Sequence, residues 1–407
     1  MIKPSLAQAI VDRTMAIINK NVNIMNEKGV IIASGDIVRI GNYHEGAAKV
    51  IKSKEKAEVT SNESITLEGV HPGISLPITF DNCIVGVIGI TGEPEEIRNY
   101  GELVRYTAEL MLEQASLKDE IYLQKTAWRS FFHDLLSGNQ GKDEELFIQR
   151  GRMLGFDLSI PRAAIVMKMD IHKYNVKFNN DMNYTNIENN LMMIQKYEDE
   201  LIRELRFKLD LKDKVIMDFY DTGYLVILVK INNQVLSKDH QRILSDYAKK
   251  IINFIKQKID GHIIAGVSEV YSDWRDFPCS YKEGELALTI GQTFFPEENI
   301  YFFKNVQFEY GLTFIPKSLS EAFSSQILSS LINEPLNSYK EELLNTLETF
   351  FNKDMNVTKT AESLFVHRNT VLFRLNRIKE ITGYDASRFT DAFNLFLALK
   401  FLRLRSY

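Results

Sequence analysis

The sequence predicts a multidomain protein of the α/β plus all-α class, and three observations support this prediction. At 407 residues the chain is too long for a single hydrophobic core. In the first three quarters of the chain, short apolar runs beside turn residues alternate with amphipathic segments of helical period, a pattern typical of α/β domains. Roughly the last 70 residues show only the helical period, which predicts a separate helical domain.

The composition excludes two broad classes of protein. Hydrophobic residues make up 45% of the chain and charged residues 25%, a balance that excludes a mostly disordered protein. No apolar run approaches the roughly 20 residues of a membrane-spanning helix, and the N-terminus lacks the apolar segment of a signal peptide. We therefore expect a cytoplasmic protein. In that reducing compartment, Cys83 and Cys279 are expected to be buried free thiols rather than a disulfide or a metal site.

The first domain is expected to combine one helix with two hairpins. An apolar stripe predicts a helix over residues 5–19. Alternating runs around a glycine turn predict a hairpin over 22–33, and a second pair of runs predicts another over 74–90. Between the hairpins we expect a dense loop over 34–46 and a short helix that ends near Ser53.

A long helix is expected next, from Pro94 to about Ser137. Pro94, followed by Glu95 and Glu96, is typical of the first turn of a helix. Periodic apolar positions then continue to Ser137 with little interruption. A helix of about 40 residues exceeds the usual globular length and indicates a connector or dimerisation helix. Because the heptad is not strict, we expect an interrupted coiled coil at best.

The middle of the chain predicts a compact α/β sandwich, since strands alternate with helices around one tight hairpin. The strands are expected at 163–169, 215–220, 224–230 and 262–267, and the helices at 186–209, 237–259 and 280–291. Further helices are expected at 339–351, from 358, at 368–381 and at 389–404. The resulting domains are residues 1–136, 137–305 and 335–407.

The formal net charge of −5 hides an asymmetry along the chain. Residues 351–407 contain ten Lys and Arg against five Asp and Glu, so this segment carries about +5 and the remainder about −10. A small basic module attached to an acidic body is a candidate for nucleic-acid binding.

Residues 357–372 have the spacing of a helix-turn-helix. Val371, Leu375 and Ile378 recur at i, i+4 and i+7 and would pack the second helix of this motif onto its neighbours. The opposite face would carry Arg and Asn, which can pair with guanine and adenine, and an aromatic ring that suits a thymine methyl or a partner surface. The candidate DNA contacts are Arg368, Asn369, Thr370, Phe373, Arg374 and Arg377. The alternative is a solvated face of an ordinary helical bundle.

A resemblance supports the DNA-binding interpretation. Residues 364–378 read Leu-Phe-Val-His-Arg-Asn-Thr-Val-Leu-Phe-Arg-Leu-Asn-Arg-Ile. This segment resembles the C-terminal helix-turn-helix of bacterial regulators of the purine-catabolism and sugar-diacid types. The resemblance implies a helix-turn-helix bundle that binds operator DNA.

Glycine-rich loops make the first domain a candidate ligand site. Glycine lets the backbone approach a small ligand, and Arg can hold a carboxylate through two hydrogen bonds. The candidate ligand-binding residues are Ser34, Gly35, Asp36, Arg39, Gly41, His44, Gly73 and Thr91. The loops could instead be tight turns between short strands, and His44 could be a structural imidazole.

A second resemblance concerns this domain. The segment from Ala-Gln-Ala-Ile-Val-Asp-Arg-Thr-Met (7–15) to Gly-Val-Ile-Gly-Ile-Thr-Gly-Glu-Pro (86–94) is similar to the PAS-like sugar-diacid recognition domain of carbohydrate diacid regulators. The resemblance implies a transcriptional activator of sugar-diacid or glycerate uptake and catabolism, with an effector of the glucarate, galactarate or glycerate class. The long helix after Pro94 would pass the ligand state on within a homodimer. Arg13, Arg39 and His44 are then the candidate carboxylate partners.

The middle domain offers the main enzymatic alternative. Residues 167–174 resemble the first strand of diguanylate cyclases, in which an Asp, here Asp170, holds a metal. Cyclases also need a Gly-Gly-acid-acid-Phe turn, and the hairpin here reads Tyr-Asp-Thr-Gly-Tyr (220–224), without paired glycines or a second carboxylate. We expect a degenerate, non-catalytic GGDEF-like domain with no cofactor and no metal. The alternative is a nucleotide-handling signalling enzyme with a basic protein-contact tail.

Overall fold

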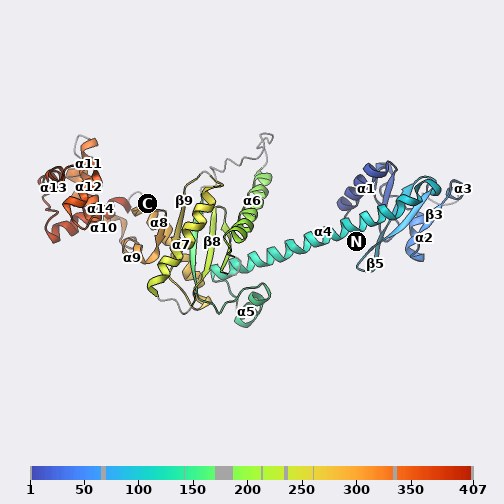
Figure 1. The fold of residues 1–407 in the computed structure, drawn as a ribbon, viewed down its shortest axis with the longest axis horizontal. Coiled ribbons are helices and arrows are strands. Elements are labelled where there is room, and N and C mark those ends of the chain that lie inside the picture. The colour runs from blue at the N-terminus through green and yellow to red at the C-terminus, as the bar shows by residue number, and fades with distance from the viewer. Residues whose placement is uncertain are drawn as a thin grey trace. The chain divides into compact units, whose positions relative to one another are not determined.

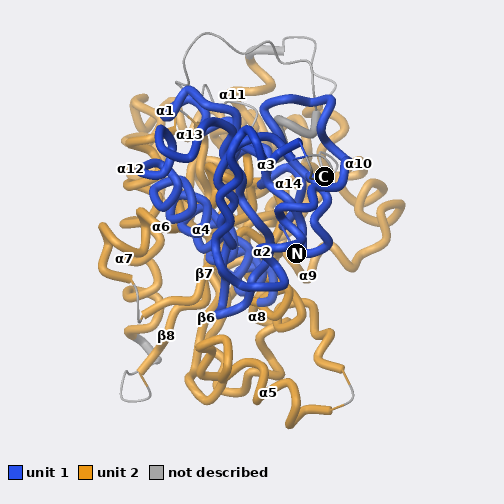
Figure 2. Tube along the Cα trace, turned by 90° about the vertical axis from the view of Figure 1, so that its right-hand side faces the viewer, with its two compact units in different colours: residues 1–127 blue, residues 128–407 orange. Residues whose placement is uncertain are grey.

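The computed structural model describes residues 2–65, 70–141, 143–169, 187–211, 214–232, 237–259, 261–332 and 337–404. They belong to two compact units, residues 1–127 and 128–407 (Figures 1 and 2). No helix of the described ranges is both long and apolar enough to cross a membrane.

The first unit is built on an antiparallel sheet of five strands in the order β2-β1-β5-β4-β3. The strands are β1 (Val22–Met25), β2 (Ile31–Ser34), β3 (Ala57–Val59), β4 (Gly73–Phe80) and β5 (Cys83–Thr91). The helices of this part of the chain are α1 (Pro4–Ile18), η1 (Ile37–Arg39), α2 (Glu45–Ser53), α3 (Ser61–Ser64) and α4 (Pro94–Ser137).

Strand alternation gives the two faces of this sheet different coverings. Ile24 and Ile88 point to one face, where they pack in one apolar cluster with residues of α1 and of the first half of α4. Met25 and Val87 point to the other face and pack against Ala47 of α2. The sheet therefore lies between α1 and α4 on one side and α2 on the other.

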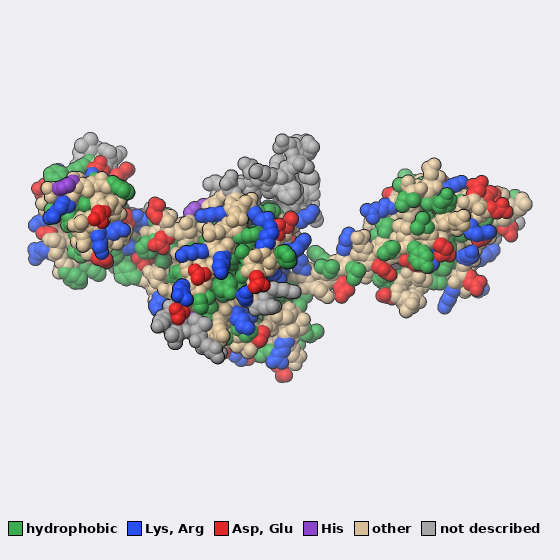
Figure 3. Space-filling model, viewed as in Figure 1, with side chains coloured by type: hydrophobic (Ala, Val, Ile, Leu, Met, Phe, Trp, Pro, Cys, Tyr) green, Lys and Arg blue, Asp and Glu red, His purple; other side chains and the backbone are tan. Residues whose placement is uncertain are grey.

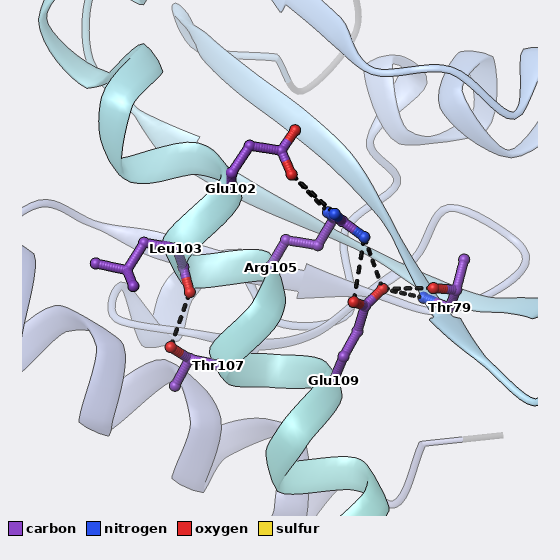
Figure 4. Close-up of polar contacts among 6 residues, drawn as sticks. All are labelled: Thr79, Glu102, Leu103, Arg105, Thr107 and Glu109. Atoms are coloured by element: carbon purple, nitrogen blue, oxygen red, sulfur yellow. Dashed lines mark hydrogen bonds and ion pairs between the residues drawn. The ribbon is translucent and has the colours of Figure 1, made fainter.

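A polar clamp also fixes α4 to the sheet (Figure 4). Glu109 of α4 accepts hydrogen bonds from the backbone N–H of Thr79 at 2.8 Å and from its hydroxyl at 2.5 Å. Arg105 donates to both carboxylate oxygens of Glu109 at 3.1 Å and to Glu102 at 2.9 Å. One flank of α4 is thus held by its own domain.

The second unit contains a sheet in the order β10-β9-β6-β8-β7, in which only the β9–β10 pair is parallel. Its strands are β6 (Arg162–Met169), β7 (Val215–Asp221), β8 (Tyr224–Lys230), β9 (Ile263–Val267) and β10 (Ile300–Phe302). Its helices are α5 (Glu144–Met153), α6 (Ile187–Lys208), α7 (Ser237–Lys256), η3 (Trp274–Asp276), α8 (Phe277–Phe294) and α9 (Phe303–Leu312).

Helices cover both faces of this second sheet. One apolar cluster joins Ile165 of β6 to residues of α6 and α7. The opposite cluster joins Val166 to α5, α8, α9 and the end of α4, which contributes Phe131 and Phe132. The last turns of α4 therefore belong to the core of the second unit.

The C-terminal helices form a bundle with its own core. They are α10 (Lys317–Ile332), α11 (Asn337–Asn352), α12 (Val357–Leu364), α13 (Arg368–Thr382) and α14 (Phe389–Leu404). Leu328 and Leu331 of α10 are buried in the same cluster as Leu343, Leu347 and Ile378. The bundle thus includes α10, which precedes the boundary expected at residue 335.

The fold class expected from the sequence is confirmed, and the strands and long helices lie close to their expected ranges. Several elements were not expected, among them β3, β10, α3, α9 and α10. The expectation of buried thiols is wrong. Cys83 opens β5 at the hairpin turn and Cys279 lies in the first turn of α8, and both are free and exposed.

Candidate functional site

A row of small and polar side chains crosses the first sheet on the face that carries α2. The pairing register aligns Ser34 of β2 with Asn23 of β1, Asn23 with Gly89 of β5, and Gly89 with Ser75 of β4. Ser34, Asn23 and Ser75 are buried. The hydroxyl of Ser34 donates to the side-chain oxygen of Asn23 at 2.6 Å. Because Gly89 has no side chain, the row is open at its centre.

A shallow, open hollow lies over this row. It is lined by Asn23, Arg39, His44, Val59, Val70, His71, Gly73, Ile74, Ser75, Gly89, Ile90 and Thr91. Its walls combine apolar side chains with hydrogen-bonding groups and basic side chains, a composition that suits a small polar anion.

Arg39 reaches the hollow from the end of η1. Asp36 caps this short helix by accepting a hydrogen bond from the backbone N–H of Val38 at 3.2 Å. Burial lowers the pKa of the Arg39 guanidinium, and the nearby Asp36 carboxylate opposes that change. The guanidinium keeps its charge, because an Arg remains protonated at physiological pH.

His44 lies at the start of α2 and is 5% exposed. Its Nδ1 accepts a hydrogen bond from the backbone N–H of Ala47 at 3.1 Å and so caps the helix. Burial and the positive charge of Arg39 lower the pKa of His44 to about 4. The imidazole is therefore neutral at pH 7 with its proton on Nε2, and it can offer a ligand one N–H donor but no charge.

The expected ligand residues fall into three groups. Arg39, His44, Gly73 and Thr91 line the hollow. Ser34 and Asp36 do not line the hollow but contact the residues that do. The Ser34 hydroxyl donates to Asn23, which lines the hollow, and accepts from the Asp36 backbone N–H at 2.9 Å. The third group lies away from it and consists of Arg13, Gly35 and Gly41.

Each residue of the third group has a local explanation. Arg13 is exposed on α1, which packs on the opposite face of the sheet. A side chain at Gly35 would collide with Met15 of α1, so this glycine permits a close approach. Gly41 has a φ of 91°, a left-handed backbone conformation that favours glycine, in an exposed turn. We therefore leave Arg13, Gly35 and Gly41 out of the candidate site.

Eight lining residues were not among the sequence candidates, and four of these are polar or glycine, namely Asn23, His71, Ser75 and Gly89. Asn23, Ser75 and Gly89 each stand between two apolar strand residues, and this alternation on a sheet covered on both faces was a usable signal. The signal shows that a small or polar residue faces one side of a strand. It does not show that three such residues become neighbours.

The second candidate site is the helix-turn-helix of α12 and α13. Asn356 caps α12 by accepting from the backbone N–H of Lys359 at 3.1 Å. Phe365 ends α12 in a left-handed conformation, with a φ of 54° and a ring that is 96% exposed. Val371 and Ile378 of α13 are buried, as expected for the packed side of this helix.

The outer side of α13 carries most of the expected DNA-binding residues. Arg368, Asn369 and Phe373 are exposed, and the Phe373 ring is 63% exposed. Thr370 is half-buried, and Arg377 forms an ion pair along the helix with Glu380 at 3.1 Å. Leu372 is a further exposed apolar residue of this surface, at 40%.

Arg374 differs from the other candidates. Its side chain is only 15% exposed, forms an ion pair with Glu342 of α11 and donates to the hydroxyl of Thr346 at 3.2 Å. Arg374 therefore has a structural role inside the bundle, because its guanidinium holds α13 to α11. We therefore exclude Arg374 from the candidate DNA surface.

The hairpin of the middle domain does not carry the turn of a cyclase. The β7–β8 hairpin turns at Thr222 and Gly223, and the Tyr220 ring stacks on His133 with ring centroids 4.6 Å apart. Asp170, the expected counterpart of the cyclase metal ligand, lies outside the described residues. Within the described ranges, no three His, Cys, Asp or Glu side chains are grouped so as to hold a metal ion.

Family models match three parts of the chain. Residues 2–135 match the sugar diacid recognition family, residues 137–290 the GGDEF-like domain, and residues 343–401 the PucR C-terminal helix-turn-helix domain. The carbohydrate diacid regulator of Escherichia coli (strain K12) is 30% identical over 404 residues, and the alignment covers 97% of this chain and 96% of that protein.

Other similarities are partial. The proline-responsive transcriptional activator PutR of Bacillus subtilis (strain 168) is 27% identical over 213 residues, which cover 50% of each chain. Among solved structures, a regulator of polyketide synthase expression from Bifidobacterium adolescentis is 20% identical and covers 70% of this chain and 94% of that chain. Its TM-score of 0.28 is too low to support a structural argument.

Proposed function

The chain belongs to the carbohydrate diacid regulator family of transcription regulators, and from this we propose that it activates sugar-diacid or glycerate catabolism genes in response to a carboxylated sugar derivative. In this proposal the first domain binds the effector, the C-terminal helix-turn-helix binds operator DNA, and the protein works in the cytoplasm as a homodimer. We assign no catalytic role to the middle domain, since its hairpin lacks the glycines and second carboxylate of a cyclase.

The hollow over the polar row is the observation that carries the ligand assignment. Arg39 supplies a positive charge and a planar pair of donors that match a carboxylate. Neutral His44 adds one N–H donor, and Asn23 and Ser75 offer partners for ligand hydroxyls. Gly89 leaves room between the last two. A small ligand with a short carbon backbone, a terminal carboxylate and several hydroxyls fits this set of groups.

The ligand assignment is tested by thermal unfolding with glucarate, galactarate or glycerate. At a ligand concentration about 100 times its Kd, binding stabilises the folded state by about 2.7 kcal/mol, so the melting temperature should rise by several degrees with at least one compound. Arg39→Ala should abolish the rise because it removes the carboxylate partner. Arg13→Ala is the matched control and should keep it.

Two outcomes would contradict the ligand assignment. One is the absence of a shift with all three compounds. The other is a shift that survives Arg39→Ala and disappears in Arg13→Ala, which would place the ligand on the opposite face of the sheet.

The DNA assignment rests on the exposed side of α13. Arg368, Asn369, Phe373 and Arg377 lie on this surface and offer hydrogen-bond donors for bases and phosphates together with one aromatic ring. Thr370, which is half-buried, lies beside them. The remainder of the chain is acidic, so the basic surface should direct DNA to this domain.

A gel-shift experiment with DNA from upstream of the chain's own gene tests this assignment. Arg377→Ala should weaken specific binding roughly ten-fold, because one charged contact is typically worth about 1–3 kcal/mol. Arg152→Ala, which removes an exposed Arg of α5 in the middle domain, should leave binding unchanged. A complex that forms equally well on unrelated DNA, or no complex at low salt, would contradict the assignment.

A further inference from the structure

Helix α4 carries two apolar faces, of which its own domain covers one. Val104, Ala108 and Leu112 are buried in the core of the first unit. Leu103, Leu110 and Leu117 recur at intervals of seven residues and are 55%, 65% and 58% exposed. Figure 3 shows hydrophobic side chains on the surface of this part of the helix. A second apolar seam on a helix that already has a core requires its own explanation.

The seam has the spacing of a coiled coil. If Leu103, Leu110 and Leu117 are assigned to position d of a heptad, position a falls on Tyr100, Thr107, Gln114 and Ile121. Tyr100 and Ile121 are 42% and 64% exposed. The seam extends over residues 100–124 and ends before Trp128, where the side chains of α4 begin to pack in the second unit.

The first domain occupies the other heptad positions. In this register Ala108, Val104 and Leu112 are positions b, e and f, and all three are buried. The clamp of Figure 4 uses Glu102 and Glu109 at position c and Arg105 at position f. Positions a, d and g therefore remain for a partner along the whole seam, and position e is covered by the domain only up to Met111, so that the later e residues can flank a partner as well.

The flanking charges select the orientation of the partner helix. Position g carries Glu113 and Glu120, and position e carries Lys118 and Lys125. In a parallel pair, each g residue faces the e residue that lies five positions further along the other helix. Glu113 would thus meet Lys118, and Glu120 would meet Lys125. In an antiparallel pair, g faces g and e faces e, which would place like charges together.

We propose that residues 100–124 of α4 form a parallel, in-register, two-stranded coiled coil with a second copy of this chain. Leucines at position d and the two acid–base pairs on each side specify this arrangement. Thr107 and Gln114 at position a bring polar side chains into the seam and weaken it. The proposal requires neither the effector nor DNA.

Disulfide cross-linking tests the register directly in the full-length chain. Cys83 and Cys279 are exposed and are first replaced by Ser. Leu103→Cys and Leu117→Cys are then made separately in this background. Their positions are about 21 Å apart along the helix, so only a parallel, in-register pair brings both into disulfide range of their own copies. Ser116→Cys is the matched control, exposed at position c beside the seam.

The expected result is oxidation to a covalent dimer at both leucine positions, at least roughly ten-fold faster than at Ser116→Cys. Cross-linking at only one of the two would show an antiparallel or shifted pair and would overturn the proposal. Equal rates at all three positions would indicate random collision and would also overturn it, as would a monomer in sedimentation experiments at micromolar concentration.

Charge reversal provides a second, independent test. The double variant Glu113→Lys/Glu120→Lys places Lys opposite Lys and should weaken dimerisation roughly ten-fold or more. Adding Lys118→Glu and Lys125→Glu to the same chain restores opposite charges and should restore the dimer. A quadruple variant as weak as the double variant would overturn the assigned pairs. The inference rests on the homodimer of the proposed function, but neither readout involves an effector or DNA, so failure here would leave the ligand and DNA assignments untouched.

Discussion

His44 shows how burial changes the chemical role of a single side chain. Its residue type suggested a charged partner for a carboxylate. In the folded domain its Nδ1 caps α2, and burial together with Arg39 lowers its pKa to about 4. The positive charge of the hollow therefore comes from Arg39, and His44 contributes a neutral donor and the geometry of the helix start.

This pKa predicts a loss of stability in mild acid. The pKa of His44 is about 4 in the folded chain and about 6.5 when unfolded, so the unfolded state binds the extra proton first as the pH falls. The contribution of the neutral His44 to the free energy of unfolding is complete above about pH 6.5. Between about pH 6.5 and pH 4 it is lost, by up to about 3 kcal/mol. Calorimetric unfolding of the full chain across this range measures it.

His44→Asn is the matched variant for this prediction, because Asn also caps helices but does not titrate. The difference in stability between parent and variant should therefore change with pH across that window. The comparison also removes the opposite effect of Glu198, whose pKa burial raises to about 7. Identical pH dependence in the two proteins would show that His44 does not contribute.

Helix α8 lies unusually close to strand β9, and two glycines make this possible. A Cβ on Gly266 of β9 would overlap the carbonyl oxygen of Gly284 in α8 and lie 2.6 Å from the backbone nitrogen of Leu288. A Cβ on Gly284 would lie 2.7 Å from the side chain of Val166. The helix therefore packs directly on the backbone of the sheet.

Gly266→Ala should destabilise the second unit by about 3 kcal/mol, because the new methyl group meets backbone atoms that can move only with the helix. Urea unfolding followed by tryptophan fluorescence measures this, since Trp128 and Trp274 both belong to that unit. Gly311→Ala in α9 is the control. Its Cβ would meet no atom within 4 Å, so its stability should stay within about 1 kcal/mol of the parent. Equal losses in both variants would contradict the close-packing explanation.

The elements differed in how well the sequence predicted them. The helix from Pro94 and the strands around Gly223 follow strong local periodicity and turn signals, and both were predicted to within a few residues. Helix α10 was missed because it is rich in serine, which disfavours helix interiors, and its stability comes from packing against α14. Strands β3 and β10 contain three residues each, too few to show alternation, and exist because a neighbouring strand pairs with them.

The candidate sites show the same division between local and long-range information. Arg39, His44 and the exposed residues of α13 could be selected from residue type and helical spacing alone. Asn23, Gly89 and Ser75 become neighbours only through the register of β1, β5 and β4, which no local pattern specifies. The ion pair between Arg374 and Glu342 likewise depends on how α11 packs against α13.

The chain as a whole consists of parts that have their own cores. The first sheet, the second sheet and the C-terminal bundle each bury a distinct set of apolar residues. Residues 351–407 carry a net positive charge, and the remainder of the chain is acidic. This distribution disfavours contact of DNA with the first two domains through repulsion and leaves the bundle as the surface that attracts phosphate.

Phe365 has a consequence for the heat capacity of complex formation. Its ring is 96% exposed, so it adds almost no packing energy to its own domain, and its left-handed backbone conformation adds strain. Any partner that covers this turn removes aromatic surface from water, and such burial lowers the heat capacity. Salt dependence would then report the phosphate contacts of the bundle, and a negative heat-capacity change would report the covering of Phe365.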